Sequence, residues 1–476
     1  MRNRVFLAAF LMALAIIPCF GEDSKTTLPV SSKSANALRL YREGIELQGN
    51  LRTDEAMRKF RSAVKADPEF AMAWAMIAVS ESSPAAATRA RVKARELMPK
   101  ASEGEQTMIR WVVARGDANM IAAIAAANDL VSRFSGDKFV LSQVGSWYVT
   151  SLNQWERGGA LQQRALTVDP NYAPALNEAG YAYAFDRKFD QAIAAMKRYA
   201  ELIPNEPNPQ DSYAEILRLA GRYDEALTHY REALKILPTF ASSQQGLGDT
   251  YALMGDQERA RSEYAKCSGG QIEARFSIAC RQMTVYSYIR ERNVEAANKQ
   301  SETFIAAMQK EGQTALAVDA ILAMAFTDKD VSSTFTSFDR AIADTLADHN
   351  MPKAQRDELL ARIMAHKVRV AVLAGDTARM ERSIAELQAF KQSTDPLIQA
   401  AWKGGNGAWL YSQKKFEEAI AELKDDDRNP FSQLMLVKAY QAAGNESAAS
   451  EVKDSVLTLH RLDIDLWIAQ EALKNK

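Results

Sequence analysis

Apolar residues recur every three to four positions along most of the chain, and short polar, glycine or proline breaks separate the segments that carry them. This spacing places apolar side chains on one face of a helix, so it predicts a succession of amphipathic helices. One break, Gly116-Asp117, divides the segment 102–135 into a helical hairpin. We therefore predict an all-α fold, and its last helix covers about Asp463 to Leu473.

The helices repeat with a period of 34 residues in the middle of the chain. Proline, a small residue, alanine and a large residue each return at this interval. The four columns are Pro170, Pro204 and Pro238; Gly180, Ala214 and Gly248; Ala192, Ala226 and Ala260; and Met196, Tyr230 and Tyr264. Such a period is typical of stacked supersecondary units.

Each column has a physical role within one unit. A small residue such as Gly180 lies in a first helix and another, Ala192, lies in the second, so that two antiparallel helices can approach closely. The large residue Met196 lies four positions after Ala192 on the same face and fills the contact. Pro204 then ends the second helix and begins the turn into the next unit.

These positions resemble the tetratricopeptide repeat, a family of stacked helical hairpins. The resemblance implies an α-solenoid of about a dozen antiparallel hairpins, wound as a right-handed superhelix with a concave inner face. The positions that we assign to the repeat are Gly44, Ala56, Pro68, Gly180, Ala192, Pro204, Ala214, Ala226, Pro238, Gly248 and Ala260.

The repeat pattern divides the chain into three parts. A tetratricopeptide-like array covers residues 35–272, degenerate helical repeats cover 273–395, and the pattern returns weakly in 396–476. We expect the final helix to cap the stack, because an exposed hydrophobic end needs a polar cover.

The N-terminus has the layout of a secretory signal peptide over residues 1–21. Arg2 and Arg4 precede the apolar run Val5–Ile17, which Pro18 ends. Small residues favour cleavage after Gly21, so we expect an exported protein, periplasmic or secreted. The apolar run is short for a membrane span, which makes an uncleaved anchor the weaker alternative. The Ser/Thr/Lys-rich segment 22–34 is expected to be disordered.

Two cysteines remain after cleavage, Cys267 and Cys280. An exported protein can keep a disulfide, and these two residues lie on neighbouring predicted helices. A disulfide bridge and two buried free thiols are therefore both kept as alternatives, because the Cα distance does not follow from the sequence. Cys19 could instead be lipidated, although Pro18 before it disfavours that.

No motif in the sequence indicates catalysis. The four histidines lack the spacing of a zinc-binding helix, and there is no nucleophile elbow or phosphate loop. We expect no catalytic residue, no metal and no cofactor. The net charge of −1 disfavours nucleic acid. The aromatic group Trp147, Tyr148 and Trp155 is interpreted as packing between repeats rather than as a binding platform.

The resemblance places a partner site on the inner face of the first helices. The residues there combine acidic, amide and aromatic groups, which suits a peptide with some basic character. The groove candidates are Asn177, Tyr181, Phe185, Asp211, Glu215, Arg218, Gln245 and Asp249. The alternative interpretation is that these residues have no binding role and are ordinary polar residues that face solvent.

Three functions follow in order of preference. The first is a non-catalytic scaffold that binds a protein or peptide partner in the concave groove. The second is a structural or self-assembling component of a cell-envelope complex, which exposed apolar residues near the C-terminal end would favour. The third is an enzyme with its site in 273–395, which a pocket with clustered histidine and carboxylate groups would favour.

Overall fold

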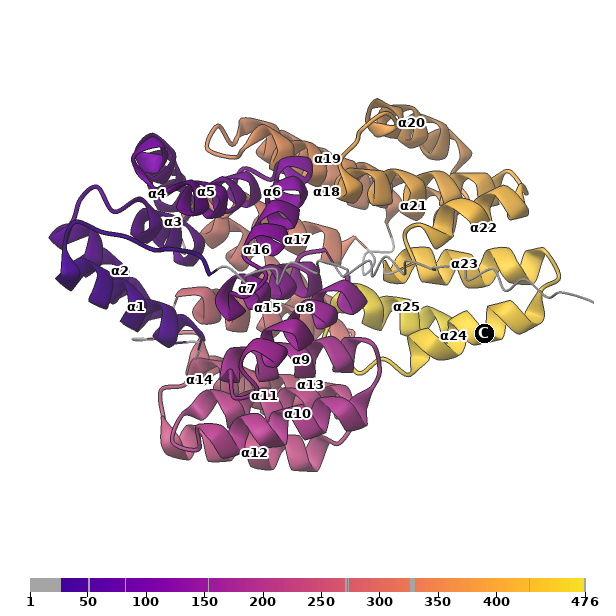
Figure 1. The fold of residues 1–476 in the computed structure, drawn as a ribbon. Helices are drawn as coiled ribbons and strands as arrows, with labels where there is room; N and C mark the ends of the chain where they lie inside the picture. Colours follow the sequence, from indigo (N-terminus) through magenta and orange to yellow (C-terminus); the bar gives the residue numbers. More distant parts are fainter. Residues whose placement is uncertain are drawn as a thin grey trace, which may run out of the picture.

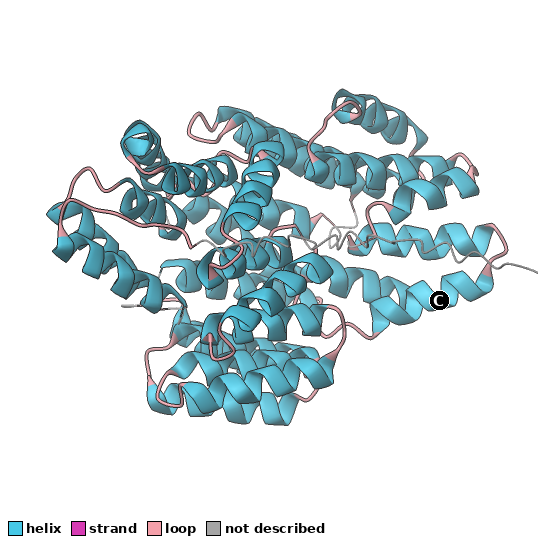
Figure 2. Cartoon of the chain, in the orientation of Figure 1, coloured by secondary structure: helices cyan, strands magenta, loops and turns pink. Residues whose placement is uncertain are grey.

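All regular secondary structure in the described part of the chain is helical (Figure 2). The computed structural model describes residues 27–49, 52–81, 83–152, 154–269, 272, 274–325, 330–427 and 429–474. The predicted signal peptide, with its cleavage after Gly21, lies outside these residues. The all-α prediction is confirmed.

The N-terminal half is a continuous series of antiparallel helix pairs, in which each helix packs against the one that follows. The predicted hairpin over 102–135 is present as α5 and α6. The helices of this half are α1 (Ala35–Gly49), α2 (Thr53–Ala66), α3 (Ala71–Ser80), α4 (Pro84–Leu97), a 3-10 turn (Met98–Lys100), α5 (Glu103–Gly116), α6 (Met120–Arg133), α7 (Lys138–Thr150), α8 (Trp155–Val168), α9 (Ala173–Phe185), α10 (Phe189–Leu202), α11 (Pro207–Leu219), α12 (Tyr223–Ile236), α13 (Ala241–Leu253) and α14 (Gln257–Cys267).

Small residues bring the two helices of a pair together at the expected positions. A Cβ atom at Gly180 would lie 2.5 Å from Cε of Met196, and one at Gly248 would lie 2.5 Å from Cε1 of Tyr264. An added side chain would have to displace Met196 or Tyr264, so these positions favour a small residue. The matching alanines are fully buried, namely Ala56, Ala192, Ala214, Ala226 and Ala260. The repeat prolines lie in turns between pairs, at Pro68, Pro204 and Pro238.

The predicted boundary near residue 273 does not separate the helices on its two sides, since α14 packs against α15. Cys267 on α14 and Cys280 on α15 form a disulfide bond with a Cα–Cα distance of 6.0 Å, so the bridged alternative is present. The helices that follow are α15 (Ala274–Arg290), α16 (Val294–Lys310), α17 (Thr314–Met324), α18 (Val331–Ala347), α19 (Lys353–Ala374), α20 (Thr377–Leu387) and a 3-10 turn (Gln388–Phe390).

The last helices are α21 (Pro396–Ser412), α22 (Phe416–Lys424), α23 (Pro430–Ala442), α24 (Glu446–Leu457) and α25 (Ile464–Lys474). Up to α24 the described helices form twelve consecutive pairs, in agreement with the predicted number of hairpins. A stretch without regular structure, Thr458–Asp463, joins α24 to α25, and we call it the connector.

The prediction that α25 simply caps the stack needs a correction. The helix does pack against α23 and α24. However, Ile464, Trp467 and Ile468 also pack into the core that α15, α17 and α19 form in the middle of the chain. In Figure 1 the yellow C-terminal segment accordingly returns toward the magenta and pink repeats. The curvature of the stack brings the middle repeats within reach of the C-terminus, which a straight stack would not do.

The prediction of disorder over 22–34 is wrong for its described part, 27–34. This segment is extended and packs along the first pairs, where Leu28 is buried. The backbone N–H of Leu28 donates to Asp137, and that of Ser31 donates to Glu105. Because buried acceptors on α5 and before α7 satisfy its backbone, the segment is held in place despite its polar composition.

Candidate functional site

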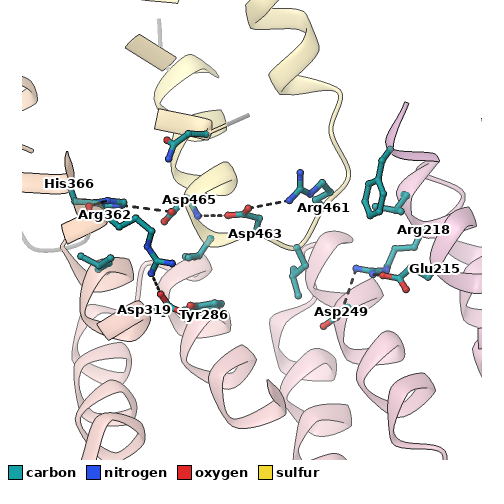
Figure 3. A pocket seen from close by; sticks show the side chains of 16 residues that line it. Glu215, Arg218, Asp249, Tyr286, Asp319, Arg362, His366, Arg461, Asp463 and Asp465 are labelled. Atoms are coloured by element: carbon teal, nitrogen blue, oxygen red, sulfur yellow. Dashed lines mark hydrogen bonds and ion pairs between the residues drawn. The ribbon is translucent and has the colours of Figure 1, made fainter. Parts of the chain in front are cut away.

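A charged cavity of about 540 Å³ lies at the inner side of the middle repeats. Its walls come from α9, α11, α13, α15, α17 and α19, and the connector with the start of α25 closes the opposite side (Figure 3). The lining residues are Phe185, Glu215, Arg218, Leu219, Asp249, Tyr286, Asp319, Leu322, Arg362, His366, Asn429, Arg461, Leu462, Asp463, Ile464 and Asp465.

Four of the eight groove candidates line this cavity, namely Phe185, Glu215, Arg218 and Asp249. Tyr181 lies beside it, since its hydroxyl donates to Oε2 of Glu215 at 2.7 Å. The remaining three, Asn177, Asp211 and Gln245, are not part of the lining.

The groove candidates also connect neighbouring repeats. Arg218 donates to Glu215 at 2.9 Å, and one of its guanidinium nitrogens lies 3.6 Å from Asp249 in the next repeat. Asp211 accepts hydrogen bonds from the hydroxyls of Ser242 and Ser243 at 2.7 and 2.6 Å. Asn177, Asp211, Arg218 and Asp249 are buried, so the interpretation as ordinary solvent-facing residues is wrong for these four.

Carboxylates outnumber guanidinium groups in the lining by five to three, so the cavity has an excess of negative charge when all are ionised. Burial, together with the charge of Asp463, raises the pKa of Asp465 to about 7. Burial likewise raises the pKa of Asp249, although Arg218 opposes this. Arg362 forms an ion pair with Asp319 on the facing helix α17. A ligand group with positive charge beside Asp249 or Asp465 would favour the ionised form of these carboxyl groups and so gain complementary charge.

His366 and the nearby carboxylates do not form a catalytic pair. Burial and the charges of Arg369 and Arg362 lower the pKa of His366 to about 3, so the ring is neutral near pH 7. Its Nδ1 lies 3.1 Å from the carbonyl oxygen of Arg362, and its Nε2 lies 3.9 Å from Asp465, too far for a hydrogen bond. The lining contains no Ser, Thr, Cys or Lys nucleophile.

No group of three or more His, Cys, Asp or Glu side chains in the described ranges is arranged to hold a metal ion.

Sequence reasoning missed the half of the cavity that comes from later in the chain. Tyr286, Asp319 and Arg362 belong to the degenerate repeats, and the connector follows the last pair. The repeat signature is weak in these regions, so no motif placed them on the inner face. The apolar pattern of α25 was the only available signal, because its buried face implied a partner surface somewhere in the stack.

The aromatic group separates into two parts. Trp147 and Tyr148 are buried and pack against each other, and Trp147 also meets Trp111 edge to face. Packing was the predicted role, and it is confirmed for these two. Trp155 is half-buried, stacks on Phe185 at 4.4 Å and borders a second cavity of about 290 Å³ beside the first. It therefore lies next to the candidate site.

The fold and the inner-face geometry define a helical repeat protein. Residues 214–255, which include the end of α11 and all of α12 and α13, match the family model described as the TPR repeat. This match falls on the units with the clearest 34-residue period. The chain therefore contains tetratricopeptide repeats in this region.

Known proteins resemble only parts of the chain. Superkiller complex protein 3 of Mus musculus is 27% identical over 108 residues, which are 23% of this chain and 7% of that protein. The chain thus matches only a small part of the length of this relative.

Solved structures share the helical repeat but superpose only loosely. A tetratricopeptide repeat protein of Parabacteroides merdae is 15% identical with a TM-score of 0.36, and covers 57% of this chain and 93% of its own. PilW, a type IV pilus biogenesis factor, is 16% identical with a TM-score of 0.31, and covers 49% and 92% respectively. A thermophilic TPR protein of Thermus thermophilus is 22% identical with a TM-score of 0.29, and covers 48% and 98%.

Among the described residues, no helix combines the length and the apolar character that crossing a bilayer requires.

Proposed function

We propose that this protein is a non-catalytic interaction scaffold that works in the cell envelope or outside the cell and binds a protein or peptide segment at the central cavity. The observation that carries the proposal is the position of Phe185, Glu215, Arg218 and Asp249, which are inner-face repeat residues, in the wall of one charged cavity. Proteins with tetratricopeptide repeats generally serve as protein-interaction scaffolds, which supports the class of function. The export part rests on the predicted signal peptide alone.

The geometry favours a short segment over a long peptide that runs through the whole groove. The connector and α25 cover part of the inner side of the middle repeats, so the open surface is limited to the cavities beside them. A cavity of this volume is in the range of sites that hold a small ligand or a few side chains.

The two other functions have less support. Within the described residues, no large apolar side chain beyond Leu373 is exposed, so the feature that would favour self-assembly through the C-terminal end is missing there. The cavity does contain a histidine and carboxylates, but the geometry and the low pKa of His366 disfavour proton transfer between them.

Affinity capture from a native cell-envelope extract tests the proposal. The bait is the chain without residues 1–21, beside a cavity variant with Phe185→Ala and Glu215→Gln. Neither substitution leaves a buried charge unpaired, whereas replacement of Arg218 or Asp249 would do so. The matched control carries Val168→Ala and Glu258→Gln, which change exposed residues outside the cavity lining.

We expect a protein that the unsubstituted bait and the control retain and the cavity variant loses. Equal retention by all three baits would overturn the cavity as the site. If no bait retains any protein, the scaffold itself is refuted. N-terminal sequencing of the protein from the exported fraction should begin at Glu22, and a chain that keeps Met1 would refute export by cleavage.

A further inference from the structure

The connector lies on the repeats in the manner of a bound peptide. It has no regular secondary structure and lies against the turns that follow α9 and α11. Arg187, directly after α9, donates to the hydroxyl of Thr458 at 2.6 Å. The hydroxyl of Tyr223, at the start of α12, is hydrogen-bonded to Nδ1 of His460 at 2.8 Å. Leu462 packs at the edge of the core that α11 to α15 form. Three of its six residues thus have specific contacts with the repeats.

The turns between the paired helices form the surface on which this C-terminal part lies. Arg187, Gly221, Gly255 and Arg292 occupy the same position in four successive turns and have left-handed φ values of +62°, +77°, +89° and +59°. Arginine is strained in this conformation, where glycine is not. Both arginines use their side chains to hold the C-terminal part, Arg187 at Thr458 and Arg292 at Glu471.

Gly221, between the two arginines, leaves room for the ring of His460. A Cβ atom at Gly221 would lie 3.1 Å from Nε2 of that histidine. Three of the four turn residues thus contact or make room for the C-terminal part, and Gly255 does not.

The connector fills the groove incompletely. The 540 Å³ cavity lies between the repeats and Arg461, Leu462 and Asp463, and the 290 Å³ cavity lies beside Leu459 and His460. Neither space is filled by protein side chains. A segment with bulkier or better-placed side chains would make more contacts in the same groove.

The helices on either side of the connector have their own contacts in the cores of the repeats. Ile464, Leu466 and Leu473 of α25 are buried in the cores of the middle and last repeats, and Val456 of α24 is fully buried. The two ends of the connector belong with these helices, because Leu459 packs on the last core and Asp463 accepts hydrogen bonds from the backbone N–H groups of Asp465 and Leu466 at the start of α25. The central residues 460–462 can therefore leave the groove while both flanking helices stay packed, because among them only Leu462 packs at a core.

We propose that the connector is an intramolecular occupant of the groove, and that the partner is an extended peptide segment of the same chemistry that replaces its central residues: a basic residue followed by leucine, in the order of Arg461 and Leu462. This inference rests on the proposed function and specifies its ligand. When Arg461 leaves, Asp463 keeps its place at the start of α25, so the lining then holds five carboxylates and two guanidinium groups. The partner's basic residue takes the place of Arg461 near Asp463, and its leucine enters the edge of the core that Leu462 leaves.

A labelled peptide tests the inference directly. The probe is fluorescein-labelled Leu-His-Arg-Leu-Asp-Ile, the sequence of residues 459–464. Fluorescence anisotropy compares its Kd for the unsubstituted chain with its Kd for a connector variant with His460→Gly, Arg461→Gly and Leu462→Gly. A tethered segment competes at millimolar effective concentration. We therefore expect the variant to bind the peptide at least about tenfold more tightly.

Two controls separate groove binding from a loss of structure. In the connector variant, Tyr223→Phe should weaken peptide binding by roughly two- to tenfold, because it removes the hydrogen bond that His460 makes. Arg187→Gly leaves the connector sequence intact but removes the hydrogen bond between Arg187 and Thr458. The probe does not contain Thr458, so the substitution weakens only the connector. This second variant should therefore also bind the probe more tightly than the unsubstituted chain. Far-UV circular dichroism checks that each variant is folded.

Two results would contradict the inference. If the unsubstituted chain, the connector variant and the Arg187→Gly variant bind the peptide equally, the connector does not compete with it. If none of them binds the peptide, the proposed chemistry of the ligand is wrong. The failure of this inference is distinct from the failure of the proposed function. If the chain captures a partner through the cavity but does not bind the peptide, the scaffold function stands. The connector is then refuted as a model of the ligand.

Discussion

Two glycines in equivalent turns allow the position of the connector to be tested by stability. Gly221 and Gly255 have φ values of +77° and +89°, so alanine at either site costs about 1–2 kcal/mol of backbone strain. A Cβ atom at Gly255 would meet nothing within 4 Å, whereas one at Gly221 would lie 3.1 Å from the ring of His460. At Gly221 the ring has to move, which weakens its hydrogen bond to Tyr223 by about 0.5–1.5 kcal/mol. We therefore expect Gly221→Ala to be the more destabilising substitution by about 1 kcal/mol.

Urea unfolding of both variants measures this difference. Far-UV circular dichroism and tryptophan fluorescence are followed together, because a repeat array need not unfold as one cooperative unit. The same pair is then measured in a His460→Ala background, where the difference should disappear if the ring is its cause. Equal losses in the unsubstituted chain, or a difference that persists without His460, would refute the placement of the connector on the turn at Gly221.

Further predictions concern the repeat, the disulfide and the cavity. Gly180→Leu should lower the free energy of unfolding by more than about 2 kcal/mol, because Met196 occupies the space of the new side chain; an unchanged thermal melt would contradict the repeat register. The chain without its predicted signal peptide should show no free thiol with Ellman's reagent until it is reduced and unfolded, since Cys267 and Cys280 are bridged; a thiol in the unreduced protein would contradict this. The folded-state pKa of Asp465 is raised to about 7 above its ordinary value of 3.8, so its contribution to stability is complete below about pH 4 and is lost as the pH rises through 7. Asp465→Asn should thus flatten the dependence of stability on pH between 4 and 8 and stabilise the protein at pH 8 by about 1 kcal/mol; an unaltered pH profile would refute the raised pKa.

Much of the local structure could be predicted because each unit determines its own packing. A 34-residue period of small, large and proline residues sets where two helices meet and where a pair ends, and Gly180 with Met196 or Gly248 with Tyr264 satisfies this rule within one unit. The helix breaks in the degenerate repeats were predictable for the same reason, since a turn after Arg290 or Ala374 depends on a few neighbouring residues.

The candidate site was only half predictable. Phe185, Glu215, Arg218 and Asp249 fall on the inner face because helical spacing places them there. That Arg218 would face Asp249 in the next repeat, and that Asp211 would accept two serine hydroxyls, depends on the angle between successive units, which small differences in many side chains decide.

The sequence by itself determined the helices, their pairing, and the positions at which small residues let them touch, since these depend on interactions over a few turns of chain. The tertiary structure alone decided that the C-terminal part returns to the middle of the stack. The reason is that the curvature of the array sums the small rotations between all its units, so the meeting of His460 with Tyr223 across 237 residues is a property of the whole stack. The charged cavity, and the connector that lies against it, exist only because the array curves far enough to bring the two regions together.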